Sequence, residues 1–138
     1  MADRYNLERF VRAQDPVYDE VCSELRDGYK RTHWMWFIFP QIKGLGHSPT
    51  ANLFAITSLE EAKAYLNHPI LGARLRECTR LVILVEGRNI HDIFGYPDDM
   101  KFRSSMTLFA QTTDNQIFKD TLTKYFDGNP DPKTLELL

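Results

Sequence analysis

Residues 33 to 41 read His-Trp-Met-Trp-Phe-Ile-Phe-Pro-Gln and contain both tryptophans of the chain. The six residues from 34 to 39, which we call the aromatic block, are all apolar and have no polar face at a period of 2 or 3.6 residues. Because a segment that is hydrophobic all round is normally buried, we predict a short helix at the centre of the core or in the wall of a pocket, stopped by Pro40. His33 and Gln41 then mark the edge of that buried segment.

Outward from this block, the chain shows repeated helix-start signals, in which a capping residue precedes proline. Asp15-Pro16, Ser48-Pro49 and Asp131-Pro132 have this form, and residues 58–61 read as a capping box. Apolar residues at helical spacing run from 70 to 85, so residues 81–85, although they could form a buried strand, are predicted to end that helix. The predicted helices cover residues 6–13, 15–29, 32–39, 48–55, 58–67, 70–85, 89–94, 98–111 and 115–126, with a last turn after Asp131.

These signals predict an all-α fold, with eight or nine short helices in one domain covering residues 1–138. The formal net charge of -2 gives no general attraction to nucleic acid. No run of apolar residues is long enough for a membrane span or a signal peptide, so we expect a soluble, cytoplasmic protein. Cys22 and Cys78 lack metal-ligand spacing; two buried thiols or one disulfide both remain possible.

The loop that follows the aromatic block is the first candidate binding segment. It runs from Pro40 to Pro49, contains two glycines, and leads into a capped helix, where free amide groups favour anions. Its candidate ligand-binding residues are Gln41, Lys43, Gly44 and Ser48, with Trp36 beside them. The alternative is a plain helix connection in which glycine only permits a positive φ.

A second candidate is the segment Lys101 to Phe109, in which two cations and three hydroxyls fall within seven residues. Such groups suit a phosphate or a carboxylate. We assign ligand-binding roles to Lys101, Arg103, Ser104 and Ser105. Alternatively, the hydroxyls bond back to the helix and the cations pair with the neighbouring aspartates.

His33, His47 and Asp92 are the candidate acid–base groups, because histidine titrates near neutral pH and Asp92 follows a histidine. Asp92 could instead only stabilise a helix start. The four histidines lack the spacing of metal ligands, so no metal is predicted, and no other cofactor.

Stretches spread along almost the whole chain match the pattern of one known family, and they include residues 10–14, 33–41, 44–46, 68–69, 71–72, 93–95 and 104–109. In these stretches the chain resembles the bacterial domain-of-unknown-function family numbered 1810, sometimes labelled calpastatin-like. The resemblance implies a compact all-helical domain and no established reaction. The calpastatin label suggests protease inhibition, but inhibitors of that kind are long and disordered, unlike this aromatic-rich chain.

Together these features predict a cleft beside the aromatic block that binds a small anionic ligand, either a phosphate or a nucleotide-like molecule. If the protein is an enzyme, hydrolysis of a phosphate- or ribose-containing bond is the simplest reaction. The alternative is an interaction module that binds a protein partner or a second copy of itself. That function would require an exposed apolar patch.

Overall fold

The computed structural model describes residues 3–112 and 116–138, and in these ranges it contains ten helices and no strand. The predicted all-α fold is therefore confirmed, and the turn after Asp131 is a helix of its own. The helices are α1 (Glu8–Gln14), α2 (Tyr18–Asp27), α3 (Met35–Ile38), α4 (Pro49–Leu53), α5 (Leu59–Asn67), α6 (Leu71–Ile83), α7 (Ile90–Phe94), α8 (Asp98–Ala110), α9 (Gln116–Phe126) and α10 (Pro132–Glu136).

Two of the predicted proline caps form as expected. The Ser48 side chain accepts a hydrogen bond from the backbone amide of Ala51 at 3.1 Å, and Asp131 accepts one from the amide of Thr134 at 3.2 Å. Proline occupies the start of both helices. These helix starts follow from local chemistry, because donor and acceptor lie only three residues apart.

Other predicted starts are wrong. Helix α2 begins at Tyr18 with no side-chain cap, and Asp15 instead forms an ion pair with Arg74 at 2.8 Å. Asn6 has a positive φ and is not the cap of α1; Asp3 accepts hydrogen bonds from the first amides of that helix. Asp3 thus supplies the cap that was expected of Asn6, whereas the start of α2 has no side-chain cap.

The capping box at residues 58–61 forms only in part. Ser58 accepts a hydrogen bond from the Glu61 amide at 3.1 Å, as predicted. The Glu61 carboxylate does not return to Ser58, because it accepts bonds from Thr57 and pairs with Arg9 at 3.1 Å. This buried carboxylate therefore connects α5 to α1.

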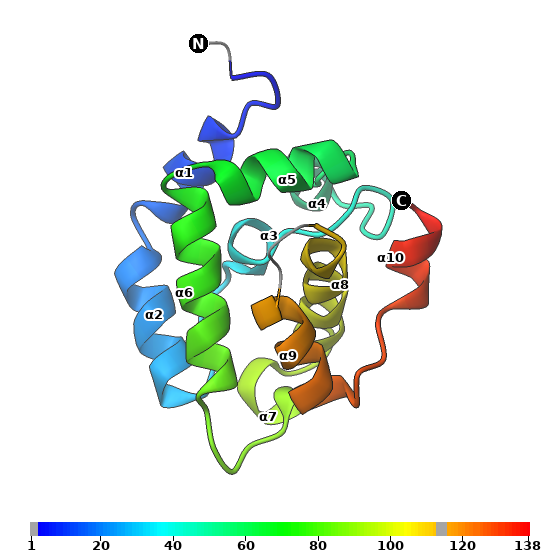
Figure 1. Ribbon diagram of the computed structural model, residues 1–138. Helices are drawn as coiled ribbons and strands as arrows, with labels where there is room; N and C mark the ends of the chain where they lie inside the picture. The colour runs from blue at the N-terminus through cyan, green and yellow to red at the C-terminus, as the bar shows by residue number, and fades with distance from the viewer. Residues whose placement is uncertain (1–2, 113–115) are drawn as a thin grey trace.

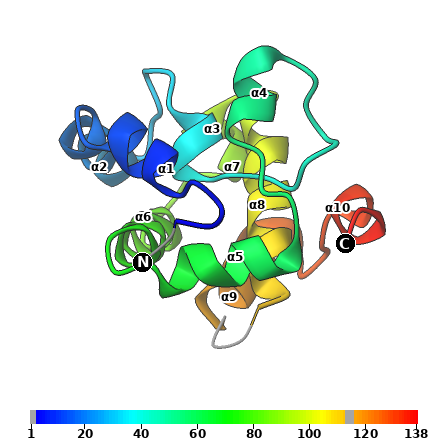
Figure 2. The ribbon, with the colours of Figure 1, turned by 90° about the horizontal axis from the view of Figure 1, so that it is seen from above.

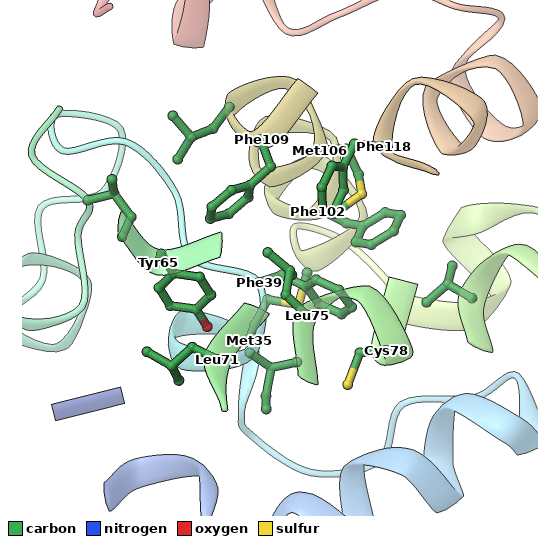
Figure 3. Packing of buried hydrophobic residues seen from close by; sticks show 14 of the residues in the cluster. Met35, Phe39, Tyr65, Leu71, Leu75, Cys78, Phe102, Met106, Phe109 and Phe118 are labelled. Carbon is green, nitrogen blue, oxygen red and sulfur yellow. The ribbon is translucent and has the colours of Figure 1, made fainter. Parts of the chain in front are cut away.

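The aromatic block enters the core from one side only. Trp34 is 1% exposed, and Phe39 is fully buried with its ring 4.8 Å from that of Phe102 in an edge-to-face arrangement (Figure 3). The predicted all-round burial is wrong for Trp36 and Phe37, which are half-buried. The reason is that α3 is a single helical turn that packs against α1 and α8. The side of α3 that faces neither of these helices is not covered by them.

Helix α8 lies at the centre of the fold, surrounded by α3, α5, α7, α9 and α10 (Figures 1 and 2). Every residue from Ser104 to Ala110 is buried, so the helix has no solvent face over that length. Residues 81–83 end helix α6, as predicted, and form no strand. The buried rings of the aromatic block pack against α7 and α8: Trp34 and Phe39 contact Phe94, and Phe39 also contacts Phe102.

A buried carboxylate fixes the chain on its way into the aromatic block. One oxygen of Glu24 accepts bonds from the amides of Arg31 and Thr32 at 2.7 and 3.0 Å and from the Trp34 indole at 3.0 Å. The other oxygen accepts a bond from the Thr32 hydroxyl at 2.6 Å. Glu24 therefore sets where the chain turns from α2 into the aromatic block.

Both cysteines, Cys22 and Cys78, are buried free thiols, which decides between the two alternatives left by the sequence. Among the described residues, no helix is both long and apolar enough to cross a membrane.

Candidate functional site

A cavity of about 300 Å³, which we call the loop cavity, lies between α3, α4, α8 and the loop that follows the aromatic block. Lys101 of α8 and the loop both line this cavity, although the two segments are far apart in the sequence. Phe54 and Ala51 complete its apolar wall. The residues of the loop cavity that the sequence analysis singled out are Trp36, Gln41, Gly44, His47, Ser48 and Lys101.

The loop is held in place at its start by a short parallel bridge. The amide of Ile56 donates to the carbonyl of Gln41 at 2.9 Å, and the amide of Lys43 donates to the carbonyl of Ile56 at 2.8 Å. Gly44 follows with φ of 108°, a conformation that favours glycine, and it packs under the side chain of Leu137. Figure 1 shows this loop beside the C-terminus.

Beyond the bridge, the loop offers unused donors. The amides of residues 44–48 donate to no acceptor within residues 3–112 and 116–138. Helix α4 has only five residues, so the loop amides, and not a helix dipole, are the groups that could attract an anion here.

Lys101 supplies positive charge at the wall of the loop cavity. Its Nζ lies 5.7 Å from the centre of the Trp36 ring and 3.7 Å from one oxygen of Asp98. The other oxygen of Asp98 is held by Lys30 at 2.8 Å. Because Asp98 is shared between two lysines, it does not neutralise Lys101 fully, and that ammonium remains available to an anion.

A second hollow of about 410 Å³ adjoins the loop cavity, and we call it the Tyr96 hollow. Both spaces are lined by Trp36 and Lys101, which therefore form the partition between them. His33, one of the predicted acid–base residues, lines the Tyr96 hollow and is exposed. Tyr96 is 77% exposed. Tyr96 has no specific signal in the sequence, because a tyrosine before proline in a turn is not a motif. Asp98 was expected only as one of the aspartates that could pair with the neighbouring cations, and it does pair with Lys101.

Arg103 and Ser104 lie away from both spaces and hold α10. The Arg103 guanidinium donates to the carbonyls of Asn129 and Pro130, each at 3.0 Å. The Ser104 hydroxyl lies 2.9 Å from the Asp131 carboxylate and 3.1 Å from its own helix at the Met100 carbonyl. The bond from Ser104 back to its own helix is the one expected if this segment is purely structural, whereas Arg103 binds backbone carbonyls before α10 and not the neighbouring aspartates.

The other predicted site residues also lie apart from the loop cavity. Ser105 is fully buried, and its hydroxyl has no partner within the described part of the chain. Asp92 forms a capping box with Asn89, whose amide donates to the Asp92 carboxylate at 3.2 Å. Lys43 is exposed and contributes its backbone to the bridge. Within residues 3–112 and 116–138, no group of three or more His, Cys, Asp or Glu side chains could hold a metal ion.

Comparison with known proteins places the chain in a class of small, all-helical proteins with no assigned reaction. Residues 4–138 match the family described as "Protein of unknown function (DUF1810)", and the chain belongs to that family. The structure is similar to the crystal structure of the conserved hypothetical protein Rv1873 from Mycobacterium tuberculosis, with 58% sequence identity and a TM-score of 0.97. That similarity covers 99% of this chain and 98% of the other. No curated protein matches this chain.

Proposed function

We propose that this protein binds a small anionic ligand, a phosphate or a phosphate ester, in the loop cavity. The observation that carries the proposal is the convergence of Lys101 and the glycine loop on one cavity beside Trp36. A lysine ammonium is a compact positive charge, and successive free amides form a concave surface that suits phosphate oxygens. The volume of about 300 Å³ is at the lower end of the range for small-molecule sites.

His47 is the candidate group for proton transfer in this cavity. It lines the loop cavity, whereas His33 lines the Tyr96 hollow and Asp92 lines neither. Binding is the primary proposal, and hydrolysis of a bound ester is a second candidate that rests on this placement of His47.

The interaction-module alternative has less support. Its requirement is a contiguous apolar patch, whereas Leu53, Ile70 and Leu84, among the exposed large apolar side chains, come from separate elements. Leu135, Leu137 and Leu138 share the C-terminal segment and are the exposed apolar group nearest to that requirement. A measurement of molar mass by light scattering tests this alternative directly: a stable dimer at micromolar concentration would favour it.

The binding proposal is tested by titrating inorganic phosphate into ¹⁵N-labelled protein. We expect the amide signals of residues 44–48 to shift, and Lys101→Met to weaken binding by about tenfold, which is the size of one lost charge-assisted hydrogen bond. Lys63→Met is the matched control, because Lys63 is exposed and lines neither the loop cavity nor the Tyr96 hollow.

The proposal fails if the loop amides do not respond to phosphate, or if Lys101→Met binds it as tightly as Lys63→Met does. Phosphorus NMR of an added phosphate ester, in the same samples, shows whether the ester is hydrolysed. Loss of turnover in His47→Asn, with binding retained, would assign proton transfer to His47.

A further inference from the structure

The Tyr96 hollow differs from the loop cavity in its charge. Lys30 and Arg31 line only the hollow, and each already has a carboxylate partner: Lys30 pairs with Asp98 at 2.8 Å, and Arg31 pairs with Asp27 at 3.0 Å. Lys30 is also almost completely buried, at 7% side-chain exposure. The cations that line only the hollow are therefore paired, whereas the loop cavity offers free amides; the loosely paired Lys101 borders both spaces.

The hollow is also the more aromatic of the two spaces. Trp34, Trp36, Phe94 and Tyr96 all line it. Trp34 and Phe94 are buried and Trp36 is half-buried, whereas Tyr96 has most of its surface in solvent. The accessible faces of Tyr96 and Trp36, beside charges that are mostly paired, suit a flat, uncharged ring system, because stacking requires little more than a second aromatic surface.

The partition lies between the anion-binding space and the aromatic space, so one small ligand could contact both. Trp36 and Lys101 border both spaces, so a ligand that contacts the partition can extend into each. Both volumes, about 300 and about 410 Å³, fall within the range of small-molecule sites. A ligand with an anionic end and a planar end joined by a short linker matches this arrangement.

From this division we infer that the ligand is a nucleotide, with its phosphate in the loop cavity, its base in the Tyr96 hollow, and its sugar over Trp36 and Lys101. The inference rests on the proposed function, because the phosphate half is the proposed anion site. His33 and Asp98, at the hollow, are the polar groups within reach of the base edge. Tyr96 would contact the base and not the phosphate, so substitution of Tyr96 distinguishes nucleotide binding from simple phosphate binding.

The test compares ribose 5-phosphate with adenosine, guanosine, cytidine and uridine 5′-monophosphates by calorimetric titration. We expect at least one nucleoside monophosphate to bind about tenfold more tightly than ribose 5-phosphate, the effect of one stacked base. Tyr96→Ala should abolish this difference and leave the affinity for ribose 5-phosphate unchanged. Base stacking should also quench tryptophan fluorescence in the wild type and not in Trp36→Phe.

The matched control is Tyr29→Ala, since Tyr29 is another exposed tyrosine and lines neither space. If ribose 5-phosphate binds but the nucleotides bind no better, or if Tyr96→Ala behaves like Tyr29→Ala, the nucleotide inference is overturned while the anion site stands. If the unphosphorylated nucleosides bind as tightly as the nucleotides, the division between the two spaces is wrong. If neither ribose 5-phosphate nor any nucleotide binds, both proposals fall.

Discussion

At the scale of single residues, a buried carboxylate stabilises this fold only because all its oxygens have donors. Glu24 is fully buried and accepts bonds from two amides, a hydroxyl and an indole. Burial by itself raises the pKa of Glu24, but the hydrogen bonds from Thr32 and Arg31 outweigh it and lower the pKa from the ordinary 4.5 to about 2. The same residue that positions Trp34 therefore makes the stability of the protein depend on pH.

The sign of this dependence follows from linkage. Because the pKa of Glu24 is lower in the folded state, its stabilisation is complete above about pH 4.5 and is lost as the pH falls toward 2. The shift corresponds to about 3 kcal/mol of unfolding free energy. In Glu24→Gln, which keeps one acceptor oxygen, this contribution is absent at every pH.

We therefore predict that the difference in unfolding free energy between wild type and Glu24→Gln shrinks by about 3 kcal/mol between pH 7 and pH 2. Urea unfolding at a series of pH values measures it. Other carboxylates with lowered pKa values, such as those of Asp3 and Asp131, affect both proteins equally. A difference that stays constant over the whole series would show that Glu24 has no special role.

At the scale of elements, the loop of the cavity depends on a helix from the other end of the chain. Arg103 and Ser104 hold the start of α10, and Leu137, just beyond that helix, covers Gly44. Two residues that were expected to bind the ligand therefore do not line the cavity. They are connected to the loop only through α10 and Leu137.

Gly44→Ala tests this connection between α10 and the loop. An alanine at φ of 108° is strained, and its methyl group would lie 3.3 Å from Leu137. We predict a loss of about 1–2 kcal/mol in unfolding free energy together with weaker phosphate binding. Urea unfolding and the phosphate titration measure the two effects.

Gly87→Ala provides a control with similar backbone strain. Gly87 has φ of 74°, no atom lies within 4 Å of an added methyl group, and the residue is absent from the wall of the loop cavity. This variant should lose stability and keep its affinity for phosphate. Equal phosphate affinities in the two alanine variants would rule out a role for Gly44 in shaping the site.

At the scale of the whole molecule, one hydrophobic cluster connects helices from α1 to α9. It includes Leu7 near one end of the chain and Leu122 near the other, with Phe39, Phe102 and Phe109 between them. All the described helices except α4 and α10 contribute buried residues to this cluster, and α10 packs against α8. We therefore expect the domain to unfold in one cooperative transition.

Two probes in the same sample test this cooperativity. Far-UV circular dichroism follows all helices, whereas fluorescence of the Trp36→Phe variant follows only Trp34, which lies in the core. The two urea midpoints should coincide. In a variant that also carries Phe102→Ala, both midpoints should fall together, and the unfolding free energy should decrease by about 3–5 kcal/mol. Separate midpoints would show that part of the fold unfolds independently.

The sequence alone determined those parts of this protein that depend on neighbours within one helical turn. The caps at Ser48 and Asp131 and the helix over residues 71–83 follow from groups three or four residues apart, and they were predicted. The candidate loop was also found, because a glycine-containing turn beside an aromatic block is a local pattern. Trp36 and His47, which line the cavity, were candidates for the same reason, and their roles in binding stay a prediction.

Only the tertiary structure decided which distant groups meet. Asp15 pairs with Arg74 instead of capping α2, and Arg103 turns to α10 while Lys101, two residues earlier, faces the loop cavity. A cation or a carboxylate can pair with many different groups at similar energy. Which partner it has therefore depends on which elements the apolar core brings together. The convergence of Lys101 with the loop, and of Tyr96 with Trp36, is a result of that core packing and has no signature in the order of residues.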